Sequence, residues 1–165
     1  MAAEIDLRCD DARWTDALPD LSALCERVIA SAAEAVEAPS PFNVSILFAD
    51  DSVMHDLNLR WRGKDKPTDV LSFPAGEGPQ TDECVFLGDI AMGWETCASD
   101  AADMERDLDF HIGHLLTHGF LHLLGFDHMT PEDASEMESM EAEILAGLGW
   151  PHPYETQERQ ATDNA

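Results

Sequence analysis

Basic residues are scarce in this chain of 165 amino acids. Nine Lys and Arg residues stand against 34 Asp and Glu residues, which gives a formal net charge of -25 at pH 7. A surface this acidic repels polyanions, so it argues against a general affinity for nucleic acid or for anionic membranes. The four cysteines form no C-x-x-C pair, which predicts neither a disulfide framework nor a thiolate zinc site.

Long apolar runs are also missing. No stretch is long enough to span a bilayer, and the first residues lack the basic segment and apolar run of a signal peptide. We therefore expect a cytosolic (cytoplasmic) protein with no membrane partner. No internal repeat or domain boundary is visible, so we expect one domain over residues 1–150 and a polar, flexible tail over residues 151–165.

In the first part of the chain, apolar runs typical of strands alternate with segments whose apolar residues follow helical spacing. Helical spacing predominates later. Strands are expected at residues 4–9, 43–49, 69–73 and 84–92, with a loop rich in Gly, Pro and acidic residues between the last two. Helices are expected at residues 21–36, from an N-cap at Asp50 or Asp51 to Trp61, from Gly93 through Leu108 into the histidine-rich run, and from Thr130-Pro131 to Gly147. We predict an α/β (α+β) fold, with a small mixed sheet of about four strands packed with helices.

Five of the seven histidines fall in the segment HIGHLLTHGFLHLLGFDH, residues 111–128. On a helix, four of them recur at steps of three and four and share one face: His111, His114, His118 and His122. A single histidine on such a face is usually a core or surface residue. Five of them along a segment rich in Leu and Phe would cost desolvation energy that no other interaction offsets, so we favour a metal site.

The register identifies the ligands. His118, His122, Gly125 and His128 reproduce the spacing H-x-x-x-H-x-x-G-x-x-H, in which the glycine ends the helix and the next turn brings back the third histidine. Three neutral imidazoles suit one Zn²⁺ and leave a coordination position open, as in catalytic zinc sites, although nickel, copper or iron could also bind. His114 lacks this register, so we expect it beside the ligands or facing a substrate.

Four of the nine basic residues lie within seven positions, at Arg60, Arg62, Lys64 and Lys66. Such a cluster can be a solvated loop. In a chain this acidic we instead favour a basic patch kept for an anionic ligand.

Metzincin proteases use the related motif H-E-x-x-H-x-x-G-x-x-H, in which the glutamate is the general base. Position 119 of this chain is glycine, so a peptidase would lack its base. A peptidase of metzincin-like geometry is an alternative, but the glycine counts against it.

Taken together, HGFLHLLGFDH (118–128), LNLRWRGKDKPTDVLSFP (57–74) and LGDI (87–90) resemble the YbeY family of bacterial endoribonucleases and rRNA maturation factors. The resemblance implies a metal-dependent hydrolase of single-stranded RNA that matures the 3′ end of small-subunit rRNA and takes part in ribosome quality control. It also implies zinc ligands at His118, His122 and His128, and a functional arginine at Arg62. In this setting, a non-enzymatic ribosome-assembly factor with a structural metal is the other alternative.

The residues fit such a mechanism. Metal-bound water could attack a phosphodiester, while Arg62 holds the scissile phosphate and the other cations steer the RNA backbone. The sequence does not single out a general base. Asp127 and His114 are both candidates, and Asp127 could equally orient a ligand imidazole.

Overall fold

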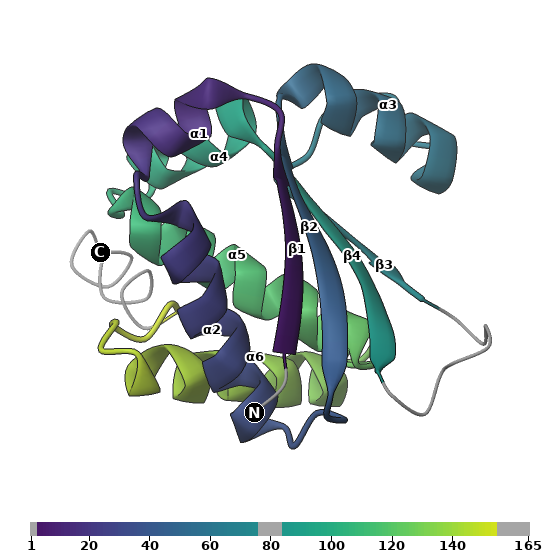
Figure 1. Ribbon diagram of the computed structural model, residues 1–165, viewed down its shortest axis with the longest axis vertical. Helices are drawn as coiled ribbons and strands as arrows, with labels where there is room; N and C mark the ends of the chain where they lie inside the picture. Colours follow the sequence, from purple (N-terminus) through teal and green to yellow (C-terminus); the bar gives the residue numbers. More distant parts are fainter. Residues whose placement is uncertain (1–2, 76–83, 155–165) are drawn as a thin grey trace.

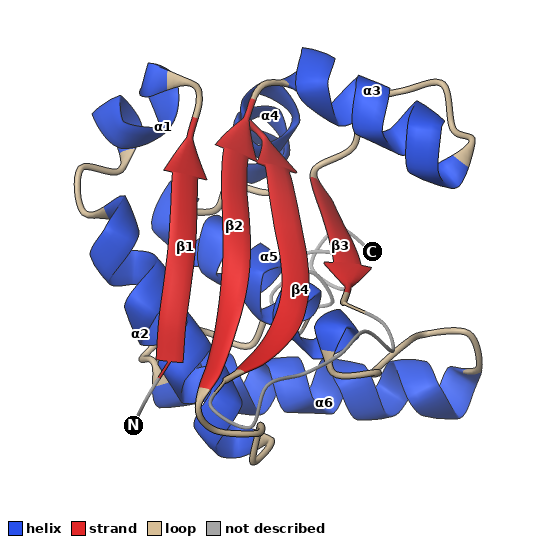
Figure 2. Ribbon diagram, turned by 45° about the vertical axis from the view of Figure 1, so that its right-hand side comes forward, coloured by secondary structure: helices blue, strands red, loops and turns tan. Residues whose placement is uncertain are grey.

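Four strands form one mixed sheet in the computed structural model, which describes residues 3–75 and 84–154. The strands are β1 (Ala3–Cys9), β2 (Phe42–Ala49), β3 (Val70–Pro74) and β4 (Val85–Gly93). Their order is β1-β2-β4-β3, in which β1, β2 and β4 run parallel and β3 is an antiparallel edge strand (Figure 2). The predicted small mixed sheet is confirmed.

Six helices pack with this sheet in the described residues. They are α1 (Ala12–Ala17), α2 (Leu21–Ala35), α3 (Asp51–Arg62), α4 (Trp94–Asp103), α5 (Leu108–Leu123) and α6 (Pro131–Gly147). Two expected N-caps are confirmed, because the side chains of Asp50 and Thr130 accept hydrogen bonds from the N–H groups of Val53 and Asp133. Helix α1 was not predicted, because its six residues are too few to show the helical spacing of apolar residues.

The helices lie in two unequal layers (Figure 1). Helices α2, α5 and α6 lie on one side of the sheet, and α3 lies on the other. The main core follows the alternation of β2, whose inward side chains Phe42, Val44, Ile46 and Phe48 are buried under α2 and α5. Beneath α3 there is a smaller cluster of Met54, Leu71 and Ala91.

Helix α5 is nearly enclosed, since twelve of its sixteen residues are buried. Gly119 allows this helix to approach the sheet, because a Cβ there would lie 3.0 Å from Oγ of Ser72 and 3.2 Å from Cγ2 of Ile90. Gly113 makes room for the ring of Trp150, which would lie 2.4 Å from such a Cβ. The histidine-rich run is therefore the central helix of the domain.

The expected helical run from Gly93 into the histidines is wrong in one respect. It is two helices, since α4 ends at Asp103 and α5 begins at Leu108. Between them Glu105 adopts a left-handed φ of 54°, which a continuous helix cannot contain. Met104, the C-cap residue of α4, is 38% exposed.

Most of the loop predicted between β3 and β4 falls at residues 76–83, and most of the predicted tail at residues 155–165, both outside the described residues. The division into residues 1–150 and 151–165 therefore stays a prediction. Among the helices of the described residues, none combines the length and apolar character that crossing a membrane requires.

Candidate metal centre

Three histidines gather at the end of α5. His118 and His122 lie on its last turns, His128 lies in the following loop, and one ring nitrogen of each lies within 4.8 Å of the others. The structure thus brings together the three predicted ligands, on the central helix and the turn after it.

The turn that returns His128 has a defined geometry. Gly125 has a φ of 98°, its N–H donates to the carbonyl of His122, and the N–H of Phe126 donates to the carbonyl of Leu121. These two bonds form a Schellman motif, in which a glycine at the left-handed position ends the helix. Gly125 therefore ends the helix as expected and turns the chain toward His128.

A contact between Nδ1 of His122 and the main chain fixes the tautomer of this ring. Its Nδ1 lies 2.9 Å from the carbonyl oxygen of Phe126, and a carbonyl can only accept, so we assign the proton to Nδ1. Burial, with a smaller contribution from the neighbouring His118, lowers the pKa of His122 and favours the neutral ring. Its Nε2 therefore carries a lone pair.

The same reasoning applies to His118. Its Nδ1 lies 3.1 Å from Oε2 of Glu141, a carboxylate that is only 1% exposed. Burial alone would raise the pKa of Glu141, but hydrogen bonds from His114 and His118 outweigh it and lower that pKa to about 2. An ionised carboxylate only accepts, so His118 is also protonated at Nδ1, and in the neutral form of the ring the lone pair is on Nε2.

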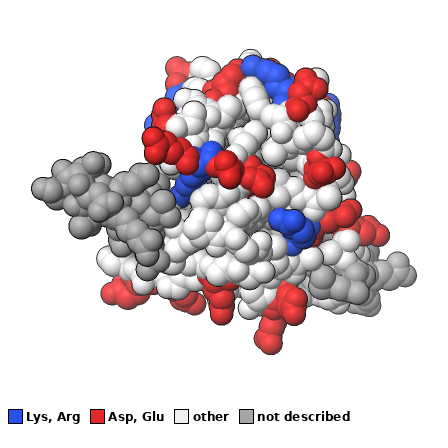
Figure 3. All heavy atoms as spheres, turned by 90° about the vertical axis from the view of Figure 1, so that its left-hand side faces the viewer, with Lys and Arg blue, Asp and Glu red and all other residues white. Residues whose placement is uncertain are grey.

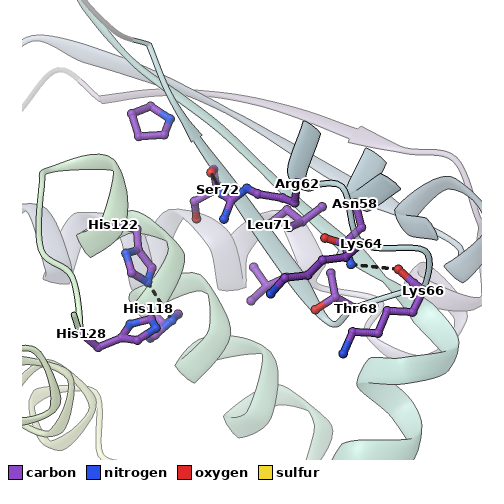
Figure 4. A pocket seen from close by; sticks show the side chains of 12 residues that line it. Asn58, Arg62, Lys64, Lys66, Thr68, Leu71, Ser72, His118, His122 and His128 are labelled. Carbon is purple, nitrogen blue, oxygen red and sulfur yellow. Dashed lines mark hydrogen bonds between the residues drawn. The ribbon is translucent and has the colours of Figure 1, made fainter. Parts of the chain in front are cut away.

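The Nε2 atoms of His118 and His122 lie only 3.1 Å apart (Figure 4). Two lone pairs at this distance repel each other unless a cation lies between them. Neutral imidazoles whose outer N–H groups are hydrogen-bonded are the ligands that zinc and similar metals use. The residues therefore fit a bound metal ion, and three of them leave a coordination position open.

The histidines line one wall of a cleft of about 380 Å³. The opposite wall comes from the end of α3 and the segment before β3, and carries Arg62, Lys64 and Lys66 (Figure 4). Gly63 ends α3 with a φ of 69°, and the amide of the buried Asn58 donates to the carbonyl of Lys66. This contact ties the basic segment to the helix.

No carboxylate is among the residues that line this cleft, which all belong to the described part of the chain. Three of the nine basic residues are there, although acidic residues exceed basic ones by 25 over the whole sequence. On the face shown in Figure 3, acidic side chains outnumber basic ones. The cleft is therefore an electropositive site on an acidic protein, suited to a polyanion.

The predicted catalytic residues lie in three different surroundings. Arg62 lines the cleft, and its Nη2 donates to the carbonyl of Ser72 at 2.9 Å. His114 does not line the cleft; it is buried and lies beside Glu141. Asp127 is exposed, accepts from the N–H of Met129, and lines a different hollow. The role of general base for His114 or Asp127 stays a prediction.

Sequence reasoning missed three residues behind the histidines. Glu141 accepts from the Tyr154 hydroxyl at 2.7 Å and lies 2.5 Å from Nε2 of His114, whose Nδ1 lies 3.1 Å from Arg106. One signal was available, because Glu141 is a carboxylate on the buried stripe of α6, four residues after Met137. No sequence signal places Arg106 or Tyr154 here.

Position 119 also bears on the peptidase alternative. A side chain there points toward Ser72 and Ile90 of the sheet, at contact distance. A glutamate would extend further in this direction, so Ser72 of β3 and Ile90 of β4 would have to move to admit it.

Comparison with known proteins agrees with this geometry. The family model described as "Endoribonuclease YbeY" matches residues 8–149. Proteins named Endoribonuclease YbeY include one from Paramagnetospirillum magneticum, 44% identical over 91% of this chain and 93% of that protein. Another, from Bradyrhizobium diazoefficiens, is 47% identical over 82% of this chain and 77% of that protein.

The fold also matches a solved structure. The solution structure of TM1509 from Thermotoga maritima aligns with a TM-score of 0.55 at 22% identity, over 87% of this chain and 91% of that one. At this identity the match supports the fold alone. The family model and the curated relatives cover most of the sequence, and on their evidence the chain belongs to the endoribonuclease YbeY family.

Proposed function

We propose that this member of the family is a zinc-dependent endoribonuclease that cleaves single-stranded rRNA. The observation that carries the proposal is the cleft itself, in which three histidines with closely spaced ring nitrogens face Arg62, Lys64 and Lys66. A metal-ligand cluster alone fits many hydrolases, whereas a facing cluster of cations is suited to a phosphodiester.

The two walls of the cleft have different proposed roles. Arg62 presents a planar set of donors that can bind two oxygens of the scissile phosphate, while its Nη2 is held by Ser72. Lys64 and Lys66 contact neighbouring phosphates. His118, His122 and His128 would hold the ion, and zinc bound there would supply Lewis acidity and lower the pKa of a bound water to near 7.

The biological setting is part of the same proposal. We place the protein in the cytoplasm, acting on the small ribosomal subunit in 3′-end maturation of its rRNA and in ribosome quality control. The acidic surface supports a substrate presented by the ribosome, because a formal net charge of -25 opposes strong binding of free RNA.

The test compares bound zinc and cleavage of single-stranded rRNA in the wild type, His122→Ala, Arg62→Ala and Arg60→Ala. We expect His122→Ala to lose both metal and cleavage, and Arg62→Ala to keep metal and lose cleavage. Arg60→Ala is the matched control, since Arg60 is exposed, pairs with Asp56 and does not line the cleft.

Full cleavage by a metal-free His122→Ala protein would overturn the proposal. Metal binding without RNA cleavage by the wild type would favour an assembly factor with a structural metal. Cleavage of a peptide but not of RNA would favour the peptidase.

A further inference from the structure

A buried carboxylate lies directly behind the histidine cluster. Glu141 is 1% exposed and comes from α6, on the side of His118 away from His122. Its Oε2 contacts Nδ1 of His118, and its Oε1 contacts both His114 and the hydroxyl of Tyr154. A charge in this position requires several hydrogen-bond donors to be stable.

The hydrogen-bond donors of this network can be assigned one after another, starting from Arg106. A guanidinium only donates, so Nδ1 of His114, 3.1 Å from Nη1 of Arg106, must accept. The proton of the neutral His114 ring is then on Nε2, which donates to Oε1 of Glu141. Arg106 is itself held by the carbonyl of Pro153, at 2.6 Å from Nη2.

With its Oε1 occupied by His114 and Tyr154, Glu141 directs Oε2 at His118. That contact holds the proton of His118 on Nδ1 and orients the ring, so that Nε2 faces the Nε2 of His122. Carboxylates in this position also raise the basicity of a ligand imidazole, and their loss typically weakens metal binding 10- to 100-fold.

We propose that Glu141 is a positioning residue of the metal centre, which holds the tautomer and orientation of His118 and is itself held by His114 and Tyr154. The inference rests on the metal site of the proposed function. It gives His114 a place in the site other than that of a general base.

The first test measures zinc affinity of metal-free protein by competition with a chromophoric chelator, and the absorption spectrum of the Co²⁺-loaded protein. Glu141→Gln keeps the shape of the side chain but has one acceptor oxygen for two imidazole N–H groups. We expect zinc binding about 10- to 100-fold weaker and an altered Co²⁺ spectrum.

Glu138→Gln is the matched control. Glu138 lies one turn earlier on α6, is exposed, and lines the same small hollow as Glu141 and His118. The substitution removes the same charge, and we expect a change of no more than about threefold, because solvent screens an exposed carboxylate. Equal losses in the two variants would overturn the positioning role, since charge alone would then account for both.

The second test needs no variant, which covers the case that Glu141→Gln does not fold. Nitrogen chemical shifts of the histidines in metal-free wild type, recorded above the imidazole pKa, report each tautomer. We expect His118 to be protonated on Nδ1 and His114 on Nε2, and the opposite tautomer of His118 would overturn the proposal.

The outcomes separate this inference from the proposed function. Wild type that binds no zinc overturns both the metal site and the role of Glu141. Wild type that binds zinc, with unchanged affinity in a folded Glu141→Gln protein, overturns only the role of Glu141.

Discussion

The hydroxyl of Ser72 donates a hydrogen bond of 3.0 Å to the main-chain oxygen of Gly119, the residue after His118 in α5. The carbonyl oxygen of the same serine accepts from Arg62. One residue of the edge strand therefore joins the arginine of one wall to the histidine helix of the other. This connection fixes the distance between the group proposed to bind phosphate and the metal ligands.

Arg62→Lys should separate charge from geometry at this connection. Lysine keeps the positive charge but cannot donate to Ser72 and bind two phosphate oxygens in one plane. We expect the rate of RNA cleavage to fall by about 10²-fold, with bound zinc unchanged. Single-turnover cleavage and metal analysis measure the two effects. Arg60→Lys should retain the wild-type rate, and an equal loss in both variants would contradict the prediction.

Gly125→Ala should weaken both the fold and the metal site. Alanine at a φ of 98° is strained by about 1–2 kcal/mol, although a Cβ there would meet no atom within 4 Å. We expect a lower free energy of unfolding in urea and weaker zinc binding, because this turn carries the chain to His128.

Gly147→Ala is the control for that substitution. Gly147 also has open space around it but is the last residue of α6 and is not among the glycines with positive φ. Alanine there should leave zinc binding unchanged and raise stability by up to about 1 kcal/mol. The prediction for Gly125 fails if both variants behave alike.

The cluster of His118, His122 and His128 could be predicted from sequence, because the three histidines lie within one short segment with a defined helix and turn period. Asp50 and Thr130 could be predicted for the same reason, since a cap acts on its own helix. The role of Ser72 could not be predicted, because packing of β3 against α5 places it. The sequence marks Glu141 only as a carboxylate on the buried stripe of α6, and the packing of α6 against α5 brings it to His118. The break at Glu105 was missed because apolar spacing continues across it.

His111→Phe should stabilise the protein, and more so in acid. Neither ring nitrogen of His111 has a hydrogen-bond partner in the described part of the chain, and the residue is 3% exposed. Burial, reinforced by Arg106 and His114 and opposed by Asp69, lowers the pKa of His111 to about 4. In the unfolded chain the ring protonates near its usual pKa of about 6.5.

The unfolded state therefore binds one more proton between these two values, so wild-type stability falls as pH drops from 6.5 toward 4. His111→Phe removes this loss, which amounts to about 3 kcal/mol once pH 4 is reached. At pH 7 the gain should be about 1–2 kcal/mol, from removing an unsatisfied polar group. Urea unfolding at pH 7 and pH 5 measures the difference, and an equal difference at both values would contradict the assignment.

Lys64→Ala and Lys66→Ala should each reduce the salt dependence of RNA binding. A cation that neutralises one phosphate of a single strand contributes about 0.7 to the slope of log affinity against log salt. Fluorescence anisotropy with metal-free protein and a labelled single strand measures this slope without cleavage. Arg8→Ala, on β1 at the far edge of the sheet, should leave the slope unchanged. An equal change of the slope in Arg8→Ala would indicate that the RNA does not bind in the cleft.

The basic cleft has a practical consequence for the choice of buffer. Inorganic phosphate and sulfate present tetrahedral oxygens like those of the scissile group, and the described residues that line the cleft with Arg62, Lys64 and Lys66 include no carboxylate. We therefore expect either anion to compete with RNA for the cleft, so that activity in phosphate-buffered saline should be lower than in a buffer without these anions.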